Sequence, residues 1–189
     1  MPDETAVKRS AMLTQADIQQ LLSNPSAESR ALVGGKVADV YDGHAMSERE
    51  RQLADGILRV LAQDVELAVR KSLAEHLQSN PDVPHDVAKK LATDVIEVAE
   101  PVLTHSDVLT DVDLIDIIRT QPTAAQVAVA KRRTVPEPVS DALAATGVEL
   151  VVATLVRNNG AEISERTFER VINDFGQSET VTSGMVSRQ

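Results

Sequence analysis

Residues 61–77 read LAQDVELAVRKSLAEHL, and this stretch indicates how the rest of the chain is built. Apolar and small side chains recur in it every three or four positions. That spacing places them on one face of an α-helix, so it predicts a helix that packs against neighbouring helices. The face consists of Val65, Ala68, Val69, Ser72, Leu73, His76 and Leu77. We therefore expect one member of a stacked array of helices.

Two charged residues, Asp64 and Arg70, belong to the same stretch of sequence as this apolar face. Asp64 precedes it, where a carboxylate can accept hydrogen bonds from the free amide groups of a helix N-terminus. Arg70 follows six residues later. Six residues rotate a helix by about 240°, so the two side chains lie on different faces and should not pair with each other. We expect each of them to contact an adjacent helical repeat.

The preceding segment predicts an antiparallel partner for this helix. Residues 47–50, SERE, form a capping box, in which Ser47 and Glu50 satisfy each other's backbone amides. An apolar stripe follows, made of Leu53, Ala54, Ile57, Leu58 and Leu61. Only a short corner near residues 62–63 separates the two helices, which predicts a helical hairpin.

The hairpin corner occurs a second time in the sequence. Residues 91–95, LATDV, align with residues 61–65, LAQDV, at a shift of 30 residues. Self-similarity at such a period is typical of repeat proteins. The copy has Glu100 where Arg70 stands in the first copy, and Pro101 follows. Because proline lacks an amide hydrogen, we expect the helix to kink or restart there.

The pattern Asp64…Val69-Arg70…Leu73-Ala74 resembles the HEAT repeat. The wider run, residues 26–175, resembles a bacterial family of HEAT-like domains of unknown function. The phrases that carry this resemblance are DVELAVRKSLAEHL, LATDVIEVAEPVLTHSDVL, AVAKRRTVPEPVSDAL and ATLVRNNGAEIS. With about eleven expected helices and no convincing strand, the predicted fold class is all-α: a right-handed α-solenoid of about five antiparallel helix hairpins, HEAT-like.

Composition indicates where this domain begins and ends. Residues 1–12 are polar and mixed in charge, so we expect a disordered N-terminus. The HEAT-like domain is expected over residues 13–176, and the Ser/Thr-rich residues 177–189 are expected to form a flexible C-terminal tail. Whether the chain is the N-terminal part of a longer protein stays open.

Three local predictions lie within the expected domain. Residues 15–23 form a short helix with Ile18, Leu21 and Leu22 on its inner face. The Gly34-Gly35 pair indicates close contact with a neighbouring helix. The aliphatic residues 148–157 form the most buried helix of the C-terminal part.

Charge and composition exclude several classes of function. The net charge of −10 argues against binding to nucleic acids or to anionic membranes. Aromatic residues make up only 2% of the chain, which leaves little for base stacking. The absence of cysteine excludes disulfides and thiolate chemistry. No signal-peptide pattern is present and no apolar run is long enough to span a bilayer, so a cytoplasmic protein is expected.

No motif of a known active site occurs in the sequence. The four histidines do not follow a metal-ligand spacing, and no nucleophile or phosphate-loop motif is present. Asp111, Asp113 and Asp116 suggest a cation site, but carboxylates in the first turns of a helix also favour the helix dipole. We therefore expect no enzyme, no cofactor and no metal.

Lys131-Arg132-Arg133 is the one dense basic spot in this acidic chain. Its cations either decorate a helix C-terminus, which the dipole favours, or contact an anion or an acidic partner. Arg70, Arg119 and Arg157 are possible neighbours in the second case.

We expect a non-enzymatic scaffold that binds a protein partner along the groove lined by the second helix of each hairpin, and an acidic segment is a candidate for the part of the partner that docks there. One alternative is a small-anion or nucleotide sensor that uses Arg132, Arg133 and Arg157 around a phosphate. A second is a nucleic-acid-binding protein of HEAT-like fold, which the negative net charge disfavours. The identity of the partner, the pathway and the oligomeric state stay open.

Overall fold

The computed structural model describes residues 25–41 and 46–187, and the secondary structure of these ranges is helical. The helices are α3 (Ala27–Val40), α4 (Glu48–Leu61), α5 (Leu67–Leu77), α6 (His85–Ala92), α7 (Ile96–His105), α8 (Asp111–Thr120), α9 (Thr123–Ala130), α10 (Glu137–Ala144), α11 (Glu149–Arg157), α12 (Glu165–Phe175) and α13 (Glu179–Val186). The expected all-α class is confirmed. The disordered N-terminus expected over 1–12 and the helix expected over 15–23 lie outside the described residues.

The chain divides into two compact units. The first unit runs to Val102 and includes Ser106–Val108, so it contains α3 to α6 and most of α7. The second unit consists of Leu103–His105 and the residues from Leu109 onward, and it contains α8 to α13. The single domain expected over 13–176 therefore comprises parts of two units.

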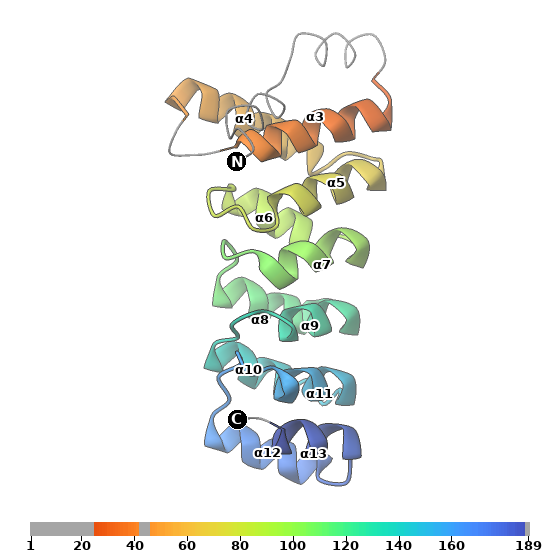
Figure 1. Ribbon diagram of the computed structural model, residues 1–189, viewed down its shortest axis with the longest axis vertical. Helices are drawn as coiled ribbons and strands as arrows, with labels where there is room; N and C mark the ends of the chain where they lie inside the picture. The colour runs from red at the N-terminus through yellow and green to blue at the C-terminus, as the bar shows by residue number, and fades with distance from the viewer. Residues whose placement is uncertain (1–24, 42–45, 188–189) are drawn as a thin grey trace, which may run out of the picture. The chain divides into compact units, whose positions relative to one another are not determined.

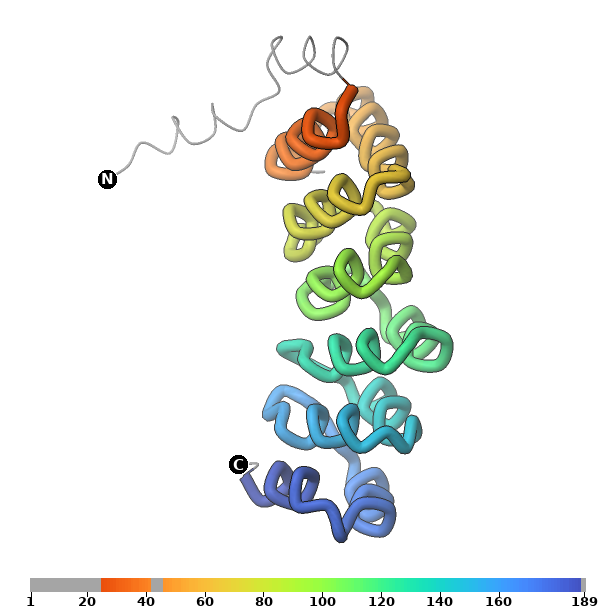
Figure 2. The backbone as a smooth tube through the Cα atoms, turned by 90° about the vertical axis from the view of Figure 1, so that its right-hand side faces the viewer, coloured from red at the N-terminus to blue at the C-terminus, as the bar shows by residue number. Residues whose placement is uncertain are grey.

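The second unit is a stack of three helix pairs in two layers (Figure 1, Figure 2). One layer holds α8, α10 and α12, and the other holds α9, α11 and α13; each helix contacts the next one of its layer. Short connectors join α8 to α9, α10 to α11 and α12 to α13. The aliphatic face of each helix is buried between the layers. The largest side chains buried between the two layers include Leu114, Ile117, Leu143 and Leu155.

In the first unit, α3 packs against α4 and α5, and α4 also contacts α5. The Gly34-Gly35 pair makes this packing possible. A methyl group on Gly34 would lie 2.9 Å from the side chain of Leu61, and one on Gly35 would lie 3.0 Å from the ring of His76. The expected close contact with a neighbouring helix is confirmed.

Local capping signals in the sequence set several helix ends. Ser47 and Glu50 form the expected capping box at the start of α4, and Thr110 and Asp113 form another at α8. The carboxylate of Asp113 thus accepts a hydrogen bond from the amide of Thr110 at the start of α8, a role that its position in the first turn favours. The side chain of Ser164 accepts a hydrogen bond from an amide of α12. These contacts lie within four residues of each other, which makes them readable from sequence.

Three expectations about helices are wrong. Val65 is exposed, because the turn at residues 64–66 precedes α5 and removes it from the helical face. Of the two outcomes expected at Pro101, the restart is wrong, because α7 runs through the proline; a proline removes only one hydrogen bond there, to the carbonyl four residues earlier. The segment 177–189, expected to be a flexible tail, contains α13, which packs on α11 and buries Val181.

Two connectors of the second unit also contact each other. The connectors that precede α10 and α12 meet in an isolated parallel bridge between Val135 and Ala161. No helix in the described ranges combines the length and the apolar character needed to cross a membrane.

Candidate functional site

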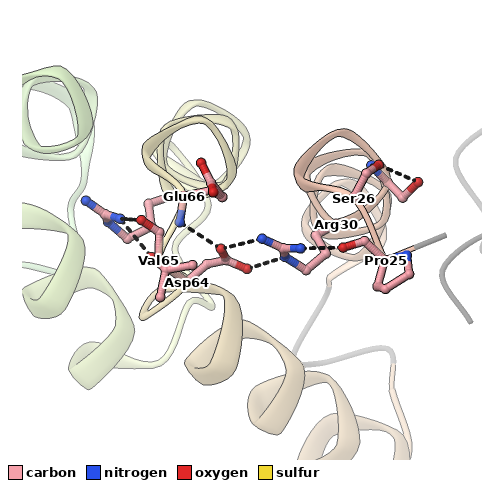
Figure 3. Close-up of polar contacts among 8 residues, drawn as sticks. Pro25, Ser26, Arg30, Asp64, Val65 and Glu66 are labelled. Atoms are coloured by element: carbon pink, nitrogen blue, oxygen red, sulfur yellow. Dashed lines mark hydrogen bonds and ion pairs between the residues drawn. The ribbon is translucent and has the colours of Figure 1, made fainter.

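Asp64 links the turn before α5 to helix α3 (Figure 3). Its carboxylate accepts hydrogen bonds from Nε and Nη2 of Arg30, at 2.6 and 2.9 Å. It also accepts one from the amide of Glu66, at 2.9 Å, as expected for a carboxylate before a helix. Arg30 donates in addition to the carbonyl of Pro25, at 2.5 Å. Two helices that are distant in sequence are thereby joined.

The same arrangement recurs at the next helix pair. Arg70 of α5 donates to both carboxylate oxygens of Asp94, at 2.6 and 3.1 Å, and Asp94 accepts from the amide of Val95, at 2.7 Å. Arg70 also donates to the main-chain carbonyl of Asp64, at 2.7 Å. We call Arg30, Asp64, Arg70 and Asp94 the Arg–Asp ladder. As expected, the side chains of Asp64 and Arg70 do not pair with each other; they pair with Arg30 of α3 and with Asp94 before α7.

The ladder is largely shielded from solvent, and its hydrogen bonds decide the charge state of its carboxylates. The side chains of Arg70 and Asp94 are 17% and 10% exposed. The hydrogen bond from Arg30 lowers the pKa of Asp64, helped by the amide of Glu66. Burial alone raises the pKa of Asp94, but the hydrogen bonds from Arg70 and from an amide outweigh it, so the net shift is downward. Both carboxylates are therefore ionised at neutral pH, and the guanidinium of Arg70 is occupied.

The first unit also contains an ion pair that, unlike the pair of Arg70 and Asp94, is exposed to solvent. Arg59 donates to both oxygens of Asp86, at 2.6 and 3.1 Å. Its geometry matches that of the Arg70 pair, but the two side chains are 45% and 59% exposed.

Side-chain amides and a guanidinium link the C-terminal ends of successive helix pairs. Asn80, after α5, donates to the carbonyl of Tyr41, at 2.8 Å. Arg132, after α9, donates to the carbonyl of Leu103, at 2.7 Å. Asn158, after α11, donates to the carbonyl of Arg132, at 2.7 Å, and to that of Ala130, at 2.9 Å. These donors satisfy carbonyls that a helix end leaves without a partner inside the helix.

The basic stretch 131–133 is divided between the interior and the surface. Lys131 and Arg133 are exposed, whereas Arg132 is buried. The three cations therefore do not form one continuous basic surface. The alternative of a phosphate site needs the guanidiniums of Arg132, Arg133 and Arg157 to point to one place. The guanidinium of Arg132 instead donates a hydrogen bond to the carbonyl of Leu103.

Of the remaining basic candidates, Arg119 lies apart from the others. Arg157, in the last turn of α11, is exposed, and it donates to the carbonyl of Thr180, at 3.1 Å. Arg119 is exposed in the last turn of α8, next to the start of α9. Lys131 follows the other end of α9, about 12 Å along the axis of that eight-residue helix. Arg119 and Lys131 thus lie at opposite ends of one helix pair.

Sequence reasoning missed Arg30 and Asn158. Asp64 and Asp94 are 30 residues apart, but their arginine partners Arg30 and Arg70 are 40 apart, so the self-match does not align them. The sequence Asn158-Asn159-Gly160 predicts only a helix stop and turn, and α11 does end at Arg157. Within residues 25–41 and 46–187, no three histidine or acidic side chains are grouped to hold a metal ion.

Comparison with known proteins is informative for the C-terminal half. Searches of curated proteins and of solved structures returned no match. Residues 98–189, from within α7 to the last residue, match the model of a family described as "Uncharacterised protein conserved in bacteria (DUF2336)".

Proposed function

We propose that the protein is a non-enzymatic binding module whose HEAT-type helix pairs form a right-handed α-solenoid, and that a protein partner with an acidic segment docks on its second helices. In the second unit these are α9, α11 and α13. The observation that carries the proposal is that three exposed cations follow or end two neighbouring helices, α9 and α11, whose C-terminal ends contact each other through Asn158. The cations are Lys131, Arg133 and Arg157, which we call the basic row.

Stacking supports the scaffold part of the proposal. In each unit, successive helices bury aliphatic faces against their neighbours, and cross-pair hydrogen bonds join one repeat to the next. Repeat proteins built in this way use long, regular faces for binding. The Arg–Asp ladder and the buried Arg132 belong to this scaffold, so Arg70 and Arg132 are not part of the proposed surface.

Charge supports the choice of an acidic partner. The chain carries a net charge of −10, so an acidic segment is repelled by most of the surface and attracted to the few places where cations gather. Arginine offers two parallel donors to a carboxylate, a geometry that lysine lacks. Leu150 and Arg157 share a face of α11, seven residues apart, and Leu150 is exposed. A segment that alternates acidic and apolar residues fits this combination.

The test uses charge reversal with matched controls. A fluorescently labelled acidic–apolar peptide is titrated with the chain at low salt, and its anisotropy is measured. Reversal of Lys131, Arg133 and Arg157 to glutamate should weaken binding at least about ten-fold, because each removes an attraction and adds a repulsion. Arg119→Glu, at the opposite end of the pair, and Lys71→Glu, in α5, should leave it within about two-fold. Equal loss in all variants would show net-charge attraction without a site.

A further inference from the structure

An apolar groove of about 480 Å³ opens between α3 and α4 in the first unit. Leu53 and Val60 of α4, 68% and 71% exposed, lie along it. The complete lining is Pro25, Arg30, Val33, Gln52, Leu53, Gly56, Ile57, Val60 and Leu61. Helix α4 thus has two apolar stripes. Ala54, Leu58 and Leu61 are buried, whereas the stripe with Leu53 and Val60 has no covering helix among the described residues.

The packing of the second unit shows what an inner helix of such a stack requires. There α10 contacts α8 on one side and α12 on the other, so both of its flanks are covered. Helix α3 corresponds to the second member of a pair, since α5 packs on it just as α11 packs on α9. The open flank of α4 is therefore where the first helix of the α3 pair would lie.

Residues 14–23, TQADIQQLLS, are the segment of this chain placed to fill that position. They are followed by Asn24, Pro25 and Ser26, and then by α3, while Pro25 itself lines the groove. A connector over residues 24–26 is as long as the connectors 93–95 and 176–178, which join the members of other pairs. The N-terminal segment that precedes the described residues is therefore joined to them at Pro25, in the lining of the groove.

The sequence of this segment matches the groove in chemistry. On a helix, Ile18, Leu21 and Leu22 share one face, and Gln20 lies on the opposite face. The segment carries a single charged residue, Asp17. A short tether also raises the local concentration of the segment to the millimolar range, which favours it over a second copy of the chain at micromolar concentration.

We propose that residues 14–23 dock in this groove as an amphipathic helix of the same chain, with Ile18, Leu21 and Leu22 against Leu53, Ile57 and Val60. The docked segment covers the open end of the repeat array, which keeps an apolar face from joining another molecule. The inference is independent of the basic row in the second unit.

Cysteine labelling in the full chain tests the proposal. The protein has no cysteine, so Gly56→Cys introduces a unique thiol in the groove. A Cβ at Gly56 would have no atom within 4 Å, so the substitution fits the described structure. The rate of reaction with a thiol reagent is measured in this background and in one that also carries Ile18→Asp and Leu21→Asp. The double substitution should raise the rate about ten-fold or more, because it removes two apolar contacts and adds charge.

Two controls separate docking from other effects. Ala16→Asp with Gln20→Asp adds the same charge on the opposite face of the predicted helix and should leave the thiol protected. Glu75→Cys, on the surface of α5 with a side chain 52% exposed, should react at one rate in all backgrounds. Helical content is checked by circular dichroism in each variant.

Three outcomes would overturn the proposal. The first is a thiol at position 56 that reacts as fast as the one at position 75 whether or not Ile18 and Leu21 are intact. The second is equal loss of protection with the Ala16 and Gln20 substitutions, which would show that the effect does not depend on the apolar face of the segment. The third is protection that disappears on dilution together with a dimeric mass, which would assign the groove to a second copy.

Discussion

Replacement of Arg70 by methionine should destabilise the first unit far more than the same replacement of Arg59. Both arginines donate to an aspartate with the same two distances, 2.6 and 3.1 Å. They differ in exposure: Arg70 and Asp94 are 17% and 10% exposed, whereas Arg59 and Asp86 are 45% and 59% exposed. Methionine keeps most of the apolar stem, so the comparison isolates the guanidinium.

The expected magnitudes follow from this difference. Removing the Arg70 guanidinium leaves Asp94 and the carbonyl of Asp64 without its hydrogen bonds. Hydrogen bonds to charged groups contribute about 1.5–3 kcal/mol each, and partial access of water to the carboxylate reduces the sum, so we expect a loss of about 2–4 kcal/mol. The exposed Arg59 pair should contribute much less than this, because water screens it, and salt should weaken it further.

The chain supplies a probe for the first unit. Tyr41, in the first unit, is its single tyrosine, there is no tryptophan, and the residue is 5% exposed. Tyrosine emission during urea unfolding therefore reports on that unit alone. A double-mutant cycle with Asp94→Asn gives the coupling energy of the pair. If the two methionine variants lost the same stability, or if Arg70→Met lost less than about 0.5 kcal/mol, shielding from solvent would not be what makes the ladder stabilising.

Three further predictions concern pH, glycine packing and a side-chain amide. Folding lowers the pKa values of Asp64 and Asp94. The stability that these two carboxylates give to the first unit should therefore be complete above about pH 4 and decrease as the pH falls below it. A variant with asparagine at both positions should show a flatter dependence of the urea midpoint on pH. Gly160→Ala should destabilise the second unit by about 3 kcal/mol or more in thermal unfolding, because its methyl group would overlap a main-chain carbonyl, whereas Gly56→Ala should stabilise the first unit by up to about 1 kcal/mol. Asn158→Ala should cost about 2–3 kcal/mol by circular dichroism in urea, since it removes two donated hydrogen bonds and the one accepted from a backbone amide, and a cost below about 0.5 kcal/mol would contradict this role.

Several features of this fold were predictable because their causes are local. The capping box at residues 47–50 and the helix stop at residues 158–160 depend on groups a few positions apart, and the structure has both. The aliphatic residues 148–157 predicted a buried helix, and α11 buries Val151, Val152, Ala153, Leu155 and Val156. Helical periodicity and caps act within one or two turns, so the amino-acid order suffices to place them.

The partners of individual side chains were decided by the tertiary structure. The rotation between Asp64 and Arg70 predicted that they point to different repeats, but their partners Arg30 and Asp94 became identifiable only with the helices packed. Lys131, Arg132 and Arg133 look alike in the sequence. Arg132 alone is buried, because the carbonyl of Leu103, 29 residues earlier, lies within its reach.

Helix α13 shows the same division between local and tertiary causes. Its sequence, ETVTSGMV, is rich in Ser, Thr and Gly and reads as a tail. It buries Val181 and brings Gly184 close to Val156 of α11. A helix of eight residues is marginal by itself, and packing against a neighbour supplies the missing stability. The amino-acid order determined where helices are capped and which faces are apolar, whereas burial of charges and the existence of α13 depend on contacts between residues that are distant in the chain.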